Sequence, residues 1–261
     1  MARYSFTINN MRSTEEINSY KELLDKGLFQ GIEIFYPYRL DKEKADLYTE
    51  NINGLIKGRN VEVVLHLPHG GVDNDLCTGD ERNIQRFYDA IDYGRKFNVT
   101  KYTLHLGSSK YDNYLENAVT VLKKLCSYTD AYIMIENMPG SNEVGYNFEE
   151  MKYLLEKTNM KNCKLIYDTG HGHVSFKDSE KEREYLNYFK NDLMHIHVSD
   201  NDSSKDAHTS IGSGNIDFKK IFEAVKEYKE LYCLEIIFRD SKDLIKFRDS
   251  LKKIIESKWI I

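Results

Sequence analysis

The sequence predicts a single (β/α)₈ barrel over residues 1–261, and three observations carry this prediction. Short β-rich runs alternate with longer amphipathic segments eight times along the chain. The length of 261 residues matches the roughly 250 residues that such barrels occupy as one domain. No linker rich in proline, glycine or serine interrupts the series. This regularity favours a closed barrel over an open parallel sheet, although either fold would place function at the carboxyl ends of the strands.

The predicted strands are short runs rich in β-branched, aromatic and other apolar residues. In chain order they cover residues 4–8, 31–36, 61–67, 101–106, 131–136, 164–168, 193–198 and 231–238. Helical spacing of apolar residues is clearest over 80–97 and 113–128. Capping residues mark two helix starts, because Ser13 precedes an acidic first turn and Asp217 precedes an apolar helical segment.

Composition places the chain among folded globular proteins. Hydrophobic residues make up 41% of the sequence and charged residues 30%, a mix that can bury a full core. No stretch approaches the roughly 18 consecutive apolar residues of a membrane span, and no apolar signal region follows Met1. We therefore expect a cytoplasmic protein without membrane contacts, and this composition is compatible with a homo-oligomer.

Cysteine usage and net charge narrow the classes of partner. The four cysteines are scattered without a CxxC pair, which indicates reduced packing residues rather than disulfides or a thiolate zinc site. The formal net charge of −5 gives no general attraction to phosphate backbones, although a local basic groove would still be compatible with nucleic acid.

Residue types that bind metals recur at the carboxyl ends of six consecutive predicted strands. They are His66, His105, Glu136, Asp168, His197 and Glu235, and His171 follows shortly after Asp168. A single buried histidine is more often a satisfied core residue than a ligand. Several carboxylates buried side by side without a cation would repel one another, so the whole pattern favours a bound divalent metal. Imidazole and carboxylate ligands suit Zn²⁺ and Mn²⁺ and argue against an iron–sulfur cluster.

Two-residue alternation separates the two histidines of the seventh predicted strand. His195 and His197 point to the same side, but His197 lies nearer the rim and is the better ligand. We expect His195 to be an inward core residue or to support the ligands. His69 and His173 fall in predicted loops, where we expect surface side chains.

These segments together resemble the xylose isomerase-like TIM barrel superfamily, which includes sugar phosphate isomerases and epimerases, ketose 3-epimerases and endonuclease IV. The resemblance spans nearly the whole chain, from Gly31-Ile32-Glu33-Ile34 to Leu234-Glu235-Ile236. Each motif is weakly specific, whereas their order and spacing are strongly so. The motifs between these ends are His66-Leu67-Pro68, His105-Leu106-Gly107, Glu136-Asn137-Met138-Pro139-Gly140, Asp168-Thr169-Gly170-His171, His197-Val198-Ser199-Asp200 and the segment 206–214.

The resemblance implies two sets of metal ligands. In the isomerase and epimerase members one metal is held by four residues, whose counterparts here are Glu136, Asp168, His197 and Glu235. Endonuclease IV holds three zinc ions and uses five further ligands. Their counterparts, all of the matching residue type, are His66, His105, His171, Asp206 and His208.

Several motif details depart from endonuclease IV. Met138-Pro139 stands where that enzyme has Thr-Ala, and Gly170 precedes His171 where it has Cys. Asp206-Ala207-His208 also lacks the Arg between the two ligands, and strand 31–36 looks more like that of the sugar isomerases. These departures favour the isomerase and epimerase branch.

The favoured function is therefore a divalent-metal-dependent isomerase or epimerase of a small sugar, free or phosphorylated. The resemblance implies that Mn²⁺, Zn²⁺, Co²⁺ or Mg²⁺ would polarise a substrate carbonyl. Glu136 and Glu235 would remove and return the neighbouring proton, and His171 would hydrogen-bond a substrate oxygen. The sequence leaves a hydride shift open as another route.

Two alternatives come from other classes. The first is a zinc phosphodiesterase with up to three zinc ions, acting at abasic sites in DNA. Its groove would need basic loops, but segments 37–40 and 69–75 supply one Arg and two Asp. The second is a barrel that binds a sugar without catalysis. Loss of Glu136 or Glu235 would mark such a protein, and both are present.

Overall fold

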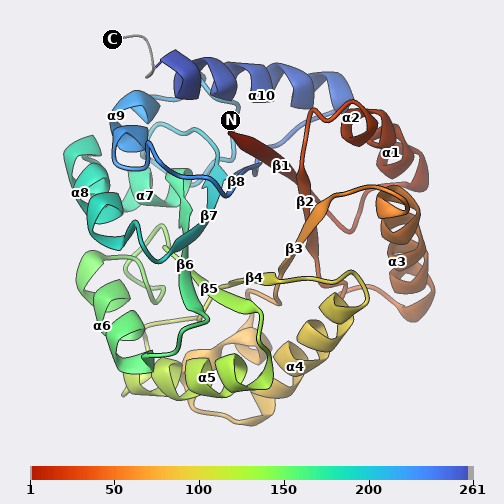
Figure 1. The fold of residues 1–261 in the computed structure, drawn as a ribbon. Coiled ribbons are helices and arrows are strands. Elements are labelled where there is room, and N and C mark those ends of the chain that lie inside the picture. The colour runs from red at the N-terminus through yellow and green to blue at the C-terminus, as the bar shows by residue number, and fades with distance from the viewer. Residues whose placement is uncertain (1, 258–261) are drawn as a thin grey trace.

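A computed structural model describes residues 2–257 and confirms the predicted barrel. Strands β1 to β8 pair in chain order and all in parallel, and β1 closes the barrel against β8. In the end-on view of Figure 1 the strands form an inner ring, and the helices cover its outside. The eight strands are β1 Arg3–Ile8, β2 Gly31–Phe35, β3 Glu62–His66, β4 Lys101–Leu104, β5 Tyr132–Glu136, β6 Cys163–Asp168, β7 Leu193–Val198 and β8 Leu231–Leu234.

The helices connect successive strands, and the predicted caps are present. Ser13 forms a reciprocal capping box with Glu16, and the Asp217 side chain accepts the main-chain N–H of Lys220. The helices are α1 Thr14–Ser19, α2 Lys21–Asp25, α3 Lys42–Ile56, α4 Arg82–Arg95, α5 Tyr114–Tyr128, α6 Phe148–Thr158, α7 Thr169–Phe176, α8 Ser179–Phe189, α9 Phe218–Glu223 and α10 Ser241–Glu256, with short 3₁₀ turns at Val72–Asn74 and Leu76–Thr78.

Two predicted strands were too long by two or more residues at their carboxyl ends. Strand β4 ends at Leu104 and β8 at Leu234, so His105 and Glu235 begin loops. Directly after β8 the N–H of Glu235 still donates to the carbonyl of Val198 in β7 at 3.2 Å, and the N–H of Ile237 then donates to the carbonyl of His208 in a loop at 2.9 Å. Both residues therefore sit on the rim, where the chain leaves the barrel.

Strand alternation divides the apolar residues into two cores. Outward-facing residues of the strands pack with the helices in one large cluster. A second, small cluster consists of Val64, Met134, Ile166 and Leu231, which lie on the opposite face of their strands and fill the barrel interior. The inward positions nearer the carboxyl ends are polar. This small cluster, the apolar plug, thus fills one part of the barrel interior, and polar side chains occupy the part nearer the carboxyl ends.

Two further expectations concern cysteines and membranes. All four cysteines lie within the described residues, where each is buried and unpaired. This agrees with the expectation of reduced packing residues. Within residues 2–257, no helix is long and apolar enough to cross a membrane.

Candidate metal centre

The predicted ligands gather at the rim because alternate strand residues point inward. Asp168, Glu136 and His66 are the last residues of their strands, and His105 and Glu235 directly follow theirs. The first three lie two positions after residues of the apolar plug and so share its inward direction. The fold therefore brings side chains from consecutive strands over one end of the barrel.

The central group consists of Glu136, Asp168, His197 and Glu235, the four ligands of the predicted single-metal site. One potential ligand atom from each lies within 4.8 Å of the others. His197 Nδ1 lies 2.7 Å from Glu235 Oε2, 3.1 Å from Glu136 Oε1 and 3.9 Å from Asp168 Oδ2. Three carboxylates and one imidazole form a donor set that fits a divalent cation such as Zn²⁺ or Mn²⁺.

A second group shares Glu136 with the first. His105 Nε2 lies 2.9 Å from Glu136 Oε2, and His66 Nε2 lies 3.8 Å from the same oxygen. Ligand atoms of these three residues again lie within 4.8 Å of one another. Glu136 therefore directs Oε1 toward His197 and Oε2 toward the two other histidines, the position of a bridging carboxylate.

The third group contains the remaining predicted ligands, His171, Asp206 and His208. Asp206 Oδ2 lies 2.8 Å from His208 Nε2 and 3.3 Å from His171 Nε2. His208 has a φ of 44°, in the left-handed region that non-glycine residues rarely adopt. Such local strain is characteristic of side chains held for function, although it does not identify the function.

Asp200 at the end of β7 organises the loop that carries the third group. Its Oδ2 accepts the N–H groups of Gly212 at 2.7 Å and Gly214 at 3.0 Å. Its main chain exchanges two hydrogen bonds with Thr209. A Cβ on Gly214 would lie 2.2 Å from the carbonyl oxygen of Asn201, so this position requires glycine. The loop is thereby fixed close to the barrel end.

Main-chain carbonyls orient three of the rings. In each ring Nδ1 faces a carbonyl oxygen, which leaves Nε2 to face its ligand group. The rings are His66, His171 and His208, with Nδ1 at 2.9, 2.8 and 3.0 Å from the carbonyl oxygens of Leu67, Asn137 and Glu235, respectively.

Two buried carboxylate oxygens support the assignment of cation sites. Asp168 Oδ1 accepts the N–H of His171 at 2.6 Å and caps α7. Within residues 2–257, Asp168 Oδ2 and Asp206 Oδ1 have no hydrogen-bond partner. A buried, unpaired carboxylate oxygen is costly, and a bound cation would satisfy it. These two oxygens belong to two different ligand groups.

The charges of the rim are strongly interdependent. Burial, together with the neighbouring carboxylates, raises the pKa of Asp168 to about 6, although His171 opposes the shift. Burial would also raise the pKa of Glu136, but His197 and His105 hold it well below its usual range. Burial would lower the pKa of His197, yet Glu235 and other carboxylates raise it well above its usual value. Metal binding would therefore displace protons from these rings.

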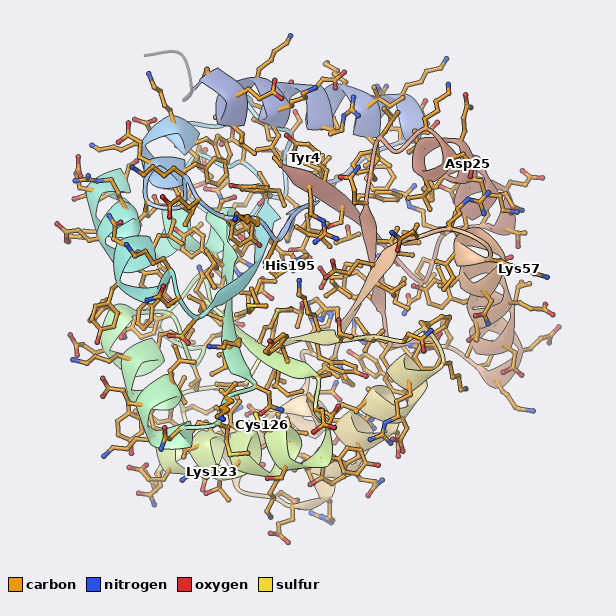
Figure 2. The ribbon with its side chains drawn as sticks, in the orientation of Figure 1. Tyr4, Asp25, Lys57, Lys123, Cys126 and His195 are labelled. Carbon is orange, nitrogen blue, oxygen red and sulfur yellow. The ribbon has the colours of Figure 1, made fainter. Side chains whose placement is uncertain are left out.

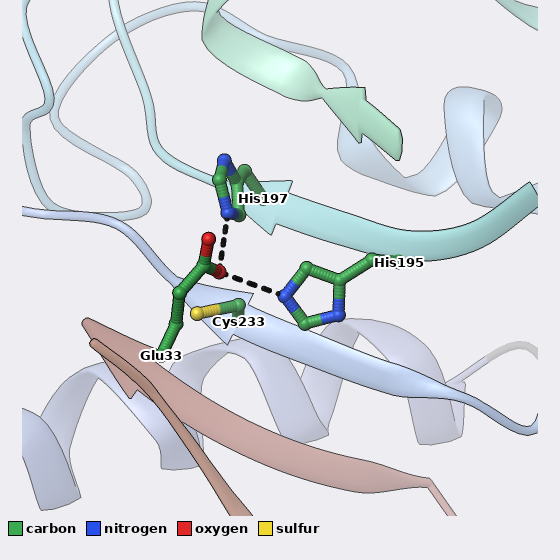
Figure 3. A group of neighbouring side chains, drawn as sticks. All are labelled: Glu33, His195, His197 and Cys233. Atoms are coloured by element: carbon green, nitrogen blue, oxygen red, sulfur yellow. Dashed lines mark hydrogen bonds and ion pairs between the residues drawn. The ribbon is translucent and has the colours of Figure 1, made fainter. Parts of the chain in front are cut away.

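A fully buried polar layer lies beneath the rim. Its His195 is inward, as expected, whereas Glu33 was not singled out from sequence. Figure 3 shows Glu33 of β2 between the two histidines of β7. Glu33 Oε2 lies 2.7 Å from His197 Nε2 and 3.0 Å from His195 Nε2, while Oε1 accepts the hydroxyl of Thr103 at 2.7 Å. In Figure 2 His195 lies near the middle of the strand ring. A charged residue between isoleucines in a predicted strand was the available signal for Glu33.

Two histidines differ from the predicted surface side chains. His173 is buried on α7, with Nε2 2.7 Å from Asn215 Oδ1 and Nδ1 3.3 Å from Glu182 Oε1. The predicted loop is a helix here, which directs this ring into the protein. His69 is partly buried, with its ring centroid 4.7 Å from that of His66 and 5.2 Å from that of His105. It borders the second group.

Cavities open on two sides of the ligand groups. One of about 470 Å³ is lined by Glu235, His208 and Arg12, together with the exposed side chains Met11 and Ile237. Another, of about 310 Å³, lies beside His105 and is lined in part by Lys110 and the glycine-containing loop before Val72. Both cavities lie beside residues of the ligand groups.

Comparisons with known proteins agree with this architecture. A family model described as Xylose isomerase-like TIM barrel matches residues 21–256. An uncharacterized protein of Methanocaldococcus jannaschii is 27% identical over 227 residues, covering 80% of this chain and 76% of the relative. A protein of Metamycoplasma arthritidis named "Probable endonuclease 4" is 29% identical over 242 residues, covering 83% of each chain. The crystal structure of a D-tagatose 3-epimerase-like protein is similar with a TM-score of 0.77 and 22% identity, covering 97% of each chain.

Proposed function

We propose that this chain is a metal-dependent phosphodiesterase with a multinuclear zinc centre. The chain belongs to the xylose isomerase-like TIM barrel family, most of whose members are enzymes. The observation that carries this proposal is the position of Glu136 between two ligand groups. Its Oε1 faces His197 at 3.1 Å, and its Oε2 faces His105 at 2.9 Å. A carboxylate so placed can bind one cation through each oxygen.

The ligand inventory exceeds the needs of a single-metal isomerase. The central group already contains four ligands, yet five further residues of ligand type surround it in two additional groups. The partnerless oxygen of Asp206 lies in the third group, so the requirement for a cation extends beyond the centre. The relative named "Probable endonuclease 4" is an independent point in favour of phosphodiester chemistry.

The three ligand groups would have different roles in phosphodiester hydrolysis. Ions bound here would supply Lewis-acid activation of water and neutralise charge on the phosphoryl and leaving oxygens. Glu136 would hold the central and second groups in fixed relation, while Asp206 and His208 would hold the third from the β7 loop. The carbonyl-anchored rings keep Nε2 directed at the ligand groups, so little reorganisation would be needed when the ions bind.

The isomerase or epimerase predicted from sequence stays the second candidate. The observation in its favour is charge: the formal net charge is −5, and Arg12 beside the larger cavity already pairs with Glu16 at 2.7 Å. A small sugar would fit that cavity without a basic groove. In this reaction Glu136 and Glu235 would transfer the proton beside a single metal-bound carbonyl. Likeness to the epimerase-like structure at 22% identity supports the shared fold and not the reaction.

The test combines metal content with two assays of the purified protein. We expect more than one zinc ion per chain and zinc-dependent hydrolysis of bis(p-nitrophenyl) phosphate and of an oligonucleotide with an abasic site. Glu136→Gln should lose both activities. Glu182→Gln is the matched control, because Glu182 is a buried carboxylate beside His173 and outside the ligand groups. A single ion, no hydrolysis and solvent-deuterium exchange into a ketose would establish the second candidate instead.

A further inference from the structure

His197 differs from the other ring ligands in how it is oriented. The rings of His66, His171 and His208 face main-chain carbonyls through Nδ1. His197 instead faces the central group through Nδ1, and its Nε2 lies 2.7 Å from the carboxylate of Glu33. Its anchor is therefore a charged side chain that comes from the other side of the barrel interior.

Glu33 is itself held rigidly in place. Thr103 donates its hydroxyl to Oε1 at 2.7 Å, and His195 Nε2 lies 3.0 Å from Oε2. The side chains of all four residues, Glu33, Thr103, His195 and His197, are completely buried. The carboxylate is shielded from bulk solvent, and its two neighbours oppose rotation away from His197.

We propose that Glu33 is a positioning residue that fixes His197 with its proton on Nε2 and its free Nδ1 lone pair directed at the central metal. The carboxylate would also make the ring a stronger ligand by hydrogen-bonding its far nitrogen. Thr103 and His195 act through Glu33, because they hydrogen-bond it and so keep its carboxylate beside His197. This proposal rests on the metal centre, which both candidate functions need, and not on the reaction catalysed.

The same residues could instead form a separate metal site, since ligand atoms of Glu33, His195, His197 and Cys233 lie within 4.8 Å of one another. The hydrogen bonds argue against this. Glu33 already has partners at both oxygens, whereas the rim carboxylates Asp168 and Asp206 each have an oxygen without one among the described residues. A cation here would also compete with the proton that anchors His197. The carboxylate of Glu33 therefore needs no metal, although His195 Nδ1 has no hydrogen-bond partner among the described residues.

The direct test is Glu33→Gln, which preserves the side-chain volume and removes the charge. We expect zinc affinity, measured by competition with a chelator, to fall by about tenfold to a hundredfold, as is typical for such partners of metal-bound histidines. In ¹⁵N spectra of imidazole-labelled, zinc-loaded protein, the Nε2 proton of His197 should be protected from exchange in the parent chain and lose that protection in the variant.

A second variant and a control separate positioning from general damage. Thr103→Val keeps the shape and removes only the donor to Glu33, so zinc affinity should fall by a smaller factor, about threefold to tenfold. Glu182→Gln removes another buried carboxylate that pairs with a histidine, His173, away from the ligand groups. It should lower the melting temperature without changing zinc affinity or the His197 signal.

The proposal is overturned if Glu33→Gln and Thr103→Val bind zinc as tightly as the parent and the His197 signal is unchanged. It is equally overturned if Glu182→Gln weakens zinc binding as much as they do, since the effect would then be general destabilisation. A parent protein that binds zinc but cleaves no phosphodiester would reject the proposed function alone. In that case weaker zinc binding by Glu33→Gln would still support the positioning role.

Discussion

The rim and the layer beneath it contain the same residue types but treat buried charge differently. Beneath the rim, the carboxylate of Glu33 is paired at both oxygens with neighbours from β4 and β7. At the rim, Asp168 and Asp206 each have a buried oxygen without a partner in the described part of the chain. The carboxylate of the lower layer is satisfied by the protein itself, although His195 Nδ1 is not, whereas at the rim two carboxylate oxygens have no partner among the described residues.

This difference separates ligands from supports in a way that residue type cannot. Glutamate and histidine occur in both layers, and in both their atoms are close enough to bind an ion. Saturation of the Glu33 carboxylate identifies the lower layer as the support. The partnerless oxygens identify the rim as the place where cations would bind. The predictions below test this division.

The largest expected effect is at Glu136, which two ligand groups share. Glu136→Gln should bind less zinc and lose more than about a hundredfold in turnover, because both groups lose a charged ligand. This loss exceeds the effect that is usual for a residue that only hydrogen-bonds a metal ligand. Circular dichroism should show an intact barrel, since side-chain volume is unchanged. Turnover within tenfold of the parent would show that Glu136 is not a ligand of the centre and would contradict the proposed bridging role.

Much of this division could have been derived from the sequence, but not all of it. Two-residue alternation and motif order indicated the nine candidate ligands, of which seven lie within three residues of a strand end, whereas Asp206 and His208 lie in the long loop after β7. Glu33 was missed because its partner His197 is 164 residues away and faces it only across a closed barrel. Local sequence contains no trace of that pairing.

Loop structure marks the second limit. The early ends of β4 and β8, and the burial of His173 against Glu182 and Asn215, depend on contacts between distant segments. Strand boundaries are the least reliable part of a prediction from periodicity. The fold and the identity of the rim residues were thus accessible, whereas their distribution among groups required coordinates.

The next effect distinguishes a multinuclear rim from a single site. Replacing His66 and His105 together with alanine should remove the second group and leave the central one intact. We expect the variant to lose about one zinc ion per chain and most phosphodiester turnover, because an ion held by Glu136 alone lacks most of its shell. Metal analysis beside the parent measures the loss. Unchanged metal content with weaker turnover would indicate that these rings contact substrate around one metal, as in the isomerase candidate.

A smaller effect is expected at Asp168, where a substitution should change stability in opposite directions in the metal-free and the zinc-bound protein. Burial raises its pKa from 3.8 to about 6 in the folded, metal-free protein. Between these values the folded state holds the proton and the unfolded state does not, so this group lowers stability as pH rises from about 4 to about 6. The full cost above pH 6 is on the order of 3 kcal/mol.

Asp168→Asn should therefore stabilise the metal-free protein at pH 8, by up to about 3 kcal/mol, and have little effect at pH 4. The amide retains the oxygen that caps α7, so the helix start is preserved. With zinc present the order should reverse, because only the parent gains the full stabilisation of binding. Urea unfolding with chelator and with zinc measures both signs. A variant less stable than the parent at pH 8 under chelator would show that Asp168 is satisfied without a cation.

The smallest effect is expected at Cys233, which lies in the lower layer beside Glu33 and His197. Burial raises the pKa of its thiol well above the usual value, so the deprotonation that metal binding requires would be costly here. Cys233→Ser should leave zinc content unchanged and cost about 1 kcal/mol of stability, because a hydroxyl replaces a thiol in a packed site. Cobalt substitution makes the test independent of stability, since a bound thiolate gives a sulfur-to-cobalt charge-transfer band that carboxylate and imidazole do not. The parent protein should lack this band. If the parent shows it and Cys233→Ser abolishes it, the lower layer binds metal too, and hydrogen-bond saturation no longer separates support from ligand in this barrel.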